Sequence, residues 1–197
     1  GVDPHKSTES GQTALSLALR ARSWAAAGVL GATSGVDDKQ DQRGPATVDS
    51  ALHRGRAPLH NAAFIGDAEA VAFLLQNGAS AELQDPTGRT ALHAAAAYGS
   101  VASVSSLLAA ARGPGTPSEK DDGALLLAAM EDVGGATALH AAALGGHAEV
   151  IEMLLAQGGG DTLAARKDHT GQTAAMLAQV MAANADPAAH ASLKALG

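Results

Sequence analysis

The eight histidines of this 197-residue chain are its most obvious candidates for metal binding or acid–base chemistry. Three of them, His60, His93 and His140, each follow a leucine and precede a short alanine-rich stretch, at separations of 33 and 47 positions. If each lies in its own helix of a stack, neighbouring histidines are ~8–10 Å apart, too far to share one metal ion. The spacing therefore argues against one metal site shared by these histidines. The other histidines show no paired ligand spacing: His5, His53, His147, His169 and His190.

Other signatures of catalysis are weak or missing. The carboxylate pairs Asp121-Asp122 and Glu131-Asp132 fall in a polar insertion rather than a rigid cleft, and we interpret them as solvated charges. Neither the nucleophile turn Gly-x-Ser-x-Gly nor a Walker phosphate loop occurs. The chain has no cysteine, which excludes disulfides, thiolate catalysis and cysteine-bound zinc. The sequence predicts a protein that is not an enzyme and that uses no cofactor or metal.

Composition narrows the class of protein further. The chain is 46% hydrophobic, which argues against wholesale disorder, but only 2% aromatic, so small side chains must let helices pack closely. A net charge of −7 argues against a general nucleic-acid binder. No membrane span is expected, because the longest apolar run, 124–130, covers only one or two helical turns. The absence of cysteine favours an intracellular, reducing compartment without establishing it.

An internal repeat organises the elements that carry these residues. Thr90-Ala91-Leu92-His93 recurs as Thr137-Ala138-Leu139-His140 and, with proline, as Ala57-Pro58-Leu59-His60; weaker copies begin at Thr13 and Thr173. A glycine stands two residues before the first position of each copy, and a second apolar stretch follows a Gly-containing turn. This spacing predicts a helix, a tight turn, a second helix and a loop, repeated along the chain. Thr90 and Thr137 are expected to cap their helices, and Pro58 suits a first helical turn.

These residues resemble the ankyrin repeat family, whose period is 33 and whose signature is Thr-Pro-Leu-His-x-Ala. The closest match is Gly78 to His93, and the resemblance covers residues 11–185. It implies an all-α, ankyrin-type solenoid: a single domain over 1–197 with about five helix-turn-helix repeats and short hairpin loops. The expected repeats are 11–33, 55–87, 88–111, 135–160 and 171–197, and the expected insertions are 34–53 and 112–134. The second insertion contains a candidate short helix over 124–130.

The resemblance also implies roles for individual residues. In this family the repeated histidine bonds the adjoining loop and the capping threonine, and partners contact the hairpin tips and the exposed ends of the first helices. Carried over by position, the partner-binding candidates are Arg54, Arg56, Phe64, Ile65, Pro86, Thr87, Arg89, Tyr98, Leu144 and Gln172.

Aromatic and arginine residues form the most informative subset of these candidates, because both are enriched at binding hot spots. Phe64, Ile65 and Tyr98 supply apolar surface, and Arg54, Arg56 and Arg89 would attract an acidic segment. The alternative is that Phe64 and Ile65 pack against a neighbouring loop.

The expected function is a non-catalytic protein–protein interaction module whose partner is another protein with an acidic or apolar segment. Two other functions remain open: a structural subunit of a large assembly, and the recruiting domain of a larger enzyme. The sequence does not determine the oligomeric state.

Overall fold

The computed structural model describes residues 49, 56–112, 123–157, 159–183 and 194–196. The expected first repeat, almost all of the first insertion and much of the second half of the expected last repeat lie outside these residues. Within the described ranges the regular elements are all helices, and an isolated β-bridge joins Lys167 and Thr173. The predicted all-α class is confirmed.

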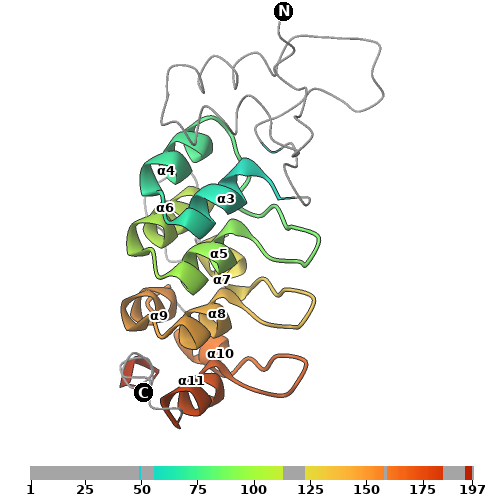
Figure 1. The fold of residues 1–197 in the computed structure, drawn as a ribbon, viewed down its shortest axis with the longest axis vertical. Coiled ribbons are helices and arrows are strands. Elements are labelled where there is room, and N and C mark those ends of the chain that lie inside the picture. Colours follow the sequence, from blue (N-terminus) through green and yellow to red (C-terminus); the bar gives the residue numbers. More distant parts are fainter. Residues whose placement is uncertain (1–48, 50–55, 113–122, 158, 184–193, 197) are drawn as a thin grey trace, which may run out of the picture.

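The helices stack in two layers, an inner and an outer one (Figure 1). The inner layer follows the repeated phrase and contains α3 (Pro58–Ile65), α5 (Ala91–Tyr98), α8 (Ala138–Gly145) and α11 (Ala174–Ala183), each packed against the next. The outer layer contains α4 (Ala68–Gln76), α6 (Val101–Arg112) and α9 (Ala148–Leu155). Hairpin loops project from the same side of the stack (Figure 1). The arrangement is the predicted solenoid of helix pairs.

Small side chains allow the inner helices to stack closely. Paired alanines follow each histidine on α3, α5 and α8 and are at most 7% exposed: Ala62, Ala63, Ala95, Ala96, Ala142 and Ala143. Leucines from the outer helices, including Leu74, Leu107 and Leu154, complete the core from the other side. No helix pair has enough apolar surface to be stable alone, so the stability of each depends on its neighbours.

Equivalent aspartates shape the successive hairpins. The N–H of Asp85 donates to the Arg89 carbonyl at 2.8 Å, and the N–H of Asp132 donates to the Ala136 carbonyl at 2.9 Å. The Asp132 Oδ1 also accepts hydrogen bonds from the N–H groups of Gly134 and Ala136. The interpretation of Asp132 as a solvated charge in a polar insertion is therefore wrong, since this residue is half-buried and builds a hairpin.

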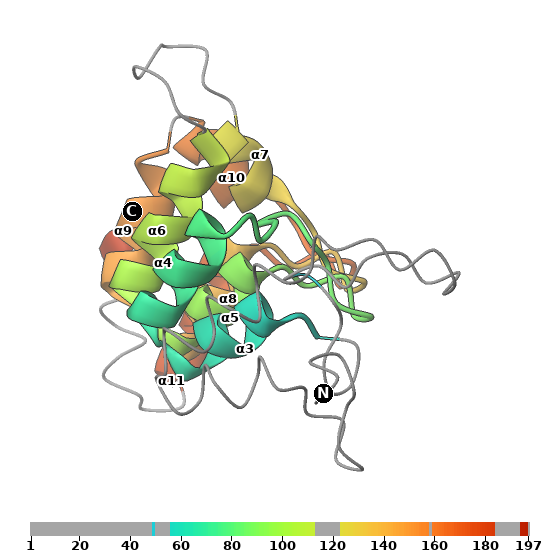
Figure 2. The same cartoon turned by 90° about the horizontal axis from the view of Figure 1, so that it is seen from above.

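Two short helices, α7 and α10, are added to the repeated helix pairs, and both lie on the same side of the stack (Figure 2). Helix α7 (Gly123–Ala129) lies in the expected second insertion and packs on α6 through its buried face, where Leu127 is fully buried. Helix α10 (Gly160–Ala164), which the sequence pattern did not predict, packs on α9 and buries Leu163. Leu125 lies beside Gly159, so the two short helices are neighbours. The second insertion thus contributes to the core.

No helix in the described part of the chain has the length and apolarity needed to cross a lipid bilayer.

Candidate functional site

The repeated histidines connect each inner helix to the following hairpin. On α5, the Nε2 of His93 lies 3.1 Å from the Ala136 carbonyl, an acceptor that requires Nε2 to carry the proton. The Nδ1 of His93 therefore accepts, and the Thr90 N–H and hydroxyl lie 3.2 and 2.9 Å from it. His140 repeats the arrangement with Thr137 and the Gln172 carbonyl. These contacts match the structural role that the resemblance implied.

His60 makes only half of these contacts. Its Nε2 lies 3.0 Å from the Arg89 carbonyl, but its buried Nδ1 has no hydrogen-bond partner among the residues that the structure describes. The reason lies three residues earlier, where Ala57 stands in the position of Thr90 and Thr137 and has no hydroxyl. Burial lowers the pKa of both His60 and His93, and the hydrogen bonds to carbonyl groups only partly offset it. Burial therefore favours the neutral form of both imidazoles.

Asp85 is the most strongly perturbed acid of the hairpins. Burial alone would raise its pKa, but hydrogen bonds from Thr87, Arg89 and Arg56 outweigh burial and lower its pKa to about 2. The Thr87 N–H donates to its Oδ1 at 2.8 Å, and the Arg56 Nε lies 3.2 Å from its Oδ2. The guanidinium of Arg56 also stands 5.9 Å from the centre of the Phe64 ring, a cation–π distance. Arg56 therefore joins the α3 surface to the next hairpin.

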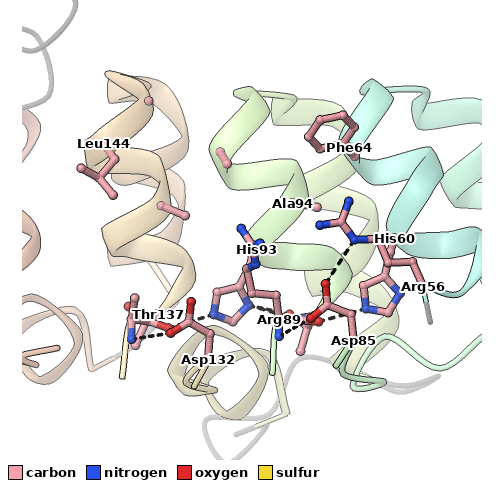
Figure 3. A pocket seen from close by; sticks show the side chains of 15 residues that line it. Arg56, His60, Phe64, Asp85, Arg89, His93, Ala94, Asp132, Thr137 and Leu144 are labelled. Atoms are coloured by element: carbon pink, nitrogen blue, oxygen red, sulfur yellow. Dashed lines mark hydrogen bonds and ion pairs between the residues drawn. The ribbon is translucent and has the colours of Figure 1, made fainter. Parts of the chain in front are cut away.

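A groove of about 320 Å³ runs between the hairpins and the inner helices; we call it the inner groove (Figure 3). Its helix side is lined by Ala94 and Ala97 of α5, flanked by Phe64 of α3 and by Ala141 and Leu144 of α8. Phe64 and Leu144 are 58% and 47% exposed, so two large apolar side chains stand uncovered on either side of an alanine floor. In Figure 3 they lie on opposite sides of Ala94.

The hairpin side of the inner groove is charged. It contains Arg56, Asp85, Arg89 and Asp132, together with His60 and His93. Asp85 and Arg56 form an ion pair, whereas the Arg89 Nε donates to the Thr87 hydroxyl at 3.1 Å. Within the described ranges, Arg89 forms no salt bridge. A bound segment would meet apolar surface on the helix side and charge on the hairpin side.

The structure brings together four of the ten predicted partner-binding residues, since Arg56, Phe64, Arg89 and Leu144 all line the inner groove. Arg54 lies outside the described residues. The others do not line it: Ile65, Pro86, Thr87, Tyr98 and Gln172.

The residues outside the inner groove have other surroundings. The ring of Tyr98 lies over the turn at Gly66, although the residue is 57% exposed. Thr87 lies at a hairpin tip, where its carbonyl accepts from the Val133 N–H at 3.0 Å. Ile65 is 60% exposed and, like Phe64, is not buried against a neighbouring loop.

Of the four charged residues that line the groove, sequence reasoning predicted Arg56 and Arg89 and missed Asp85 and Asp132. The signal was present, because each aspartate stands five positions before the threonine that caps the following helix, as Asp168 does before Thr173. The pairing of Arg56 with Asp85 could not be predicted, because it depends on how closely successive hairpins stack.

The described residues hold no group of three or more histidine or acidic side chains placed to bind a metal ion.

Comparison with protein-family models gives two matches. A model described as "Ankyrin repeats (3 copies)" matches residues 30–121, and one described as "Ankyrin repeat" matches residues 134–168. Together they span more than half of the chain, and they include α3 to α6, α8 and α9. The stacked helix pairs, the threonine–histidine caps and these two matches agree, and the chain belongs to the ankyrin repeat family.

Proposed function

We propose that this chain is a non-catalytic module that binds another protein through the inner groove and the adjoining hairpin tips. Ankyrin repeats are generally protein–protein interaction modules, and the family is typically non-catalytic. The observation that carries the proposal is the uncovered apolar pair, Phe64 and Leu144, on either side of the groove. Exposed apolar side chains beside a hollow are typical of binding surfaces.

The titratable groups of the inner groove support binding rather than catalysis. A general acid or base works best with a pKa near the operating pH. Asp85 has a pKa of about 2 and is ion-paired, whereas His93 is engaged at both ring nitrogens. These groups hold the hairpins and helices in place, and the groove that they shape is left for a partner.

The test is affinity purification with the chain as bait, followed by mass spectrometry, using the wild type and the double variant Phe64→Ala/Leu144→Ala. We expect the wild type to retain a partner that the double variant loses, because both side chains are exposed and their removal leaves the fold intact. The melting temperature of the double variant should stay within a few degrees of the wild type. Retention of the same proteins by both baits would contradict the proposal.

The same experiment separates an adaptor from a structural subunit. A partner that co-purifies at fixed stoichiometry through long washes indicates a permanent assembly. A partner that dissociates and rebinds indicates an adaptor.

A further inference from the structure

We propose that the inner groove receives a partner segment with one bulky apolar side chain next to a carboxylate. The apolar side chain occupies the hollow over α5 between Phe64 and Leu144, and the carboxylate pairs with Arg89. This inference rests on the proposed function and specifies the chemistry of the partner.

The hollow arises from the sizes of equivalent residues on successive inner helices. Counting four positions after each repeated histidine gives Phe64 on α3, Ala97 on α5 and Leu144 on α8. Because the middle helix carries alanine where both neighbours carry a large side chain, the surface is hollow at α5. Ala94, one turn earlier, extends the hollow toward the hairpins. The shape fits one large side chain of a partner, with Phe64 and Leu144 as its walls.

The charges on the hairpin side indicate which residue accompanies that side chain. The carboxylate of Asp85 is buried and already satisfied by hydrogen bonds from Thr87 and Arg89 and by the ion pair with Arg56. Arg56 is thus neutralised within the protein. Arg89 is exposed, and in the described part of the chain its guanidinium makes no ion pair.

Asp132 is the other charged residue of the inner groove that forms no ion pair among the described residues, and it is less available than Arg89. It is half-buried, and its Oδ1 accepts hydrogen bonds from two backbone N–H groups, at 2.8 and 3.0 Å. Such bonds stabilise the carboxylate without a cation. Arg89 is the charge that a partner can reach, and a carboxylate complements it.

The test uses a library of random 12-residue peptides displayed on phage and selected against the whole 197-residue chain. We expect the selected peptides to share a Phe, Trp, Leu or Met with an Asp or Glu a few positions away. Individual peptides are then synthesised and titrated by fluorescence anisotropy. Selected peptides that are basic, or that lack a large apolar residue, would overturn the inference.

Four variants, one of them a control, map the bound peptide. Ala97→Gln fills the hollow with an uncharged side chain at an exposed position and should weaken binding at least about tenfold. Arg89→Gln should weaken it about threefold, with a smaller dependence on salt, and Arg89→Lys should restore part of the loss. Ile65→Ala is the matched control, because Ile65 is as exposed as Phe64 but does not line the groove, and binding should change less than about twofold.

The outcomes distinguish this inference from the function on which it rests. Peptides insensitive to Ala97→Gln overturn the hollow as the binding site, and peptides insensitive to Arg89→Gln overturn the carboxylate contact. In either case the proposed function still stands if the native partner is lost from the Phe64→Ala/Leu144→Ala bait. The opposite combination is also possible. If the selected peptides have the predicted chemistry but the Phe64→Ala/Leu144→Ala bait still retains the native partner, the proposed function is the claim that is refuted.

Discussion

At the scale of single residues, one missing hydroxyl distinguishes α3 from α5 and α8. Thr90 and Thr137 each meet the Nδ1 of the histidine three positions later, whereas Ala57 offers no hydroxyl and the Nδ1 of His60 has no partner in the described part of the chain. The backbone is already suited to the missing residue: Ala57 has φ −70° and ψ 160°, and Thr90 has φ −86° and ψ 170°. An unsatisfied buried acceptor of this kind is destabilising.

We therefore predict that Ala57→Thr stabilises the protein by about 1 kcal/mol, because the new hydroxyl caps α3 and pairs with His60. Urea denaturation followed by circular dichroism measures the change. Thr90→Ala is the matched opposite substitution and should destabilise by a similar amount or more. A lower stability of Ala57→Thr than of the wild type would show that the pocket beside His60 has no room for a hydroxyl.

Stability should also depend on pH through the buried histidines. The pKa values of His60 and His93 lie below their ordinary value of 6.5 in the folded protein, so the unfolded chain binds more protons as pH falls. Their contribution is present above about pH 6.5 and is lost progressively below it. The contribution of Asp85, whose pKa falls from 3.8 to about 2, is lost only at more acidic pH, between those two values.

We expect the free energy of unfolding, measured by urea titration, to be lower at pH 5 than at pH 7.5. In the His93→Gln variant the difference between the two pH values should shrink, because one of the two buried histidines has been removed. A difference that is unchanged in the variant would assign the pH dependence to other residues.

At the scale of elements, the hairpins are held at a fixed spacing by backbone contacts. Gly88 and Gly171 occupy the same position in two hairpins that flank the hairpin of Gly135, and they have similar left-handed φ values, +77° and +82°. A Cβ on Gly88 would lie 2.9 Å from the backbone nitrogen of Val133, whereas one on Gly171 would meet no described atom within 4 Å. Substitutions at these two glycines therefore distinguish two effects: both introduce the strain of a left-handed non-glycine residue, but only a substitution at Gly88 also crowds the next hairpin.

Gly171→Ala should destabilise by about 1 kcal/mol, the cost of a left-handed alanine. Gly88→Ala should cost about 1–3 kcal/mol more, because the backbone of the next hairpin must move. Thermal and urea denaturation of both variants give the comparison. Equal losses of stability in the two variants would mean that the hairpins shift apart freely and that the contacts between their tips contribute little to stability.

Helix α7 shows where a sequence pattern fails at this scale. The apolar run over 124–130 predicts a short helix, but only its packing on α6 makes Leu127 fully buried while its neighbour Leu126 stays 64% exposed. We predict that Leu127→Ala destabilises by ~2–5 kcal/mol and that Leu126→Ala changes stability little. Denaturation curves of the two variants test this, and similar values for both would place α7 outside the core.

At the scale of the whole molecule, the sequence predicts stacking better than it predicts the inner groove. The repeated Thr-Ala-Leu-His phrase, the turn glycines and the second apolar stretch of each repeat depend on local periodicity, and they place α3, α5 and α8 correctly. The groove depends on comparisons between repeats, such as Ala97 between Phe64 and Leu144. It also depends on the contact of Arg56 with Asp85, across 29 positions of sequence. Neither feature can be seen in one repeat alone.

The most direct test of protein binding at the inner groove is site-specific photo-crosslinking in the native cell extract. A benzophenone amino acid is placed at Ala94 on the groove floor, at Leu144 on its wall, or at the exposed Glu152 on outer helix α9. We predict that the first two positions form an adduct with the same protein and that Glu152 does not. An adduct at Glu152 with none at Ala94 or Leu144 would contradict binding at the groove.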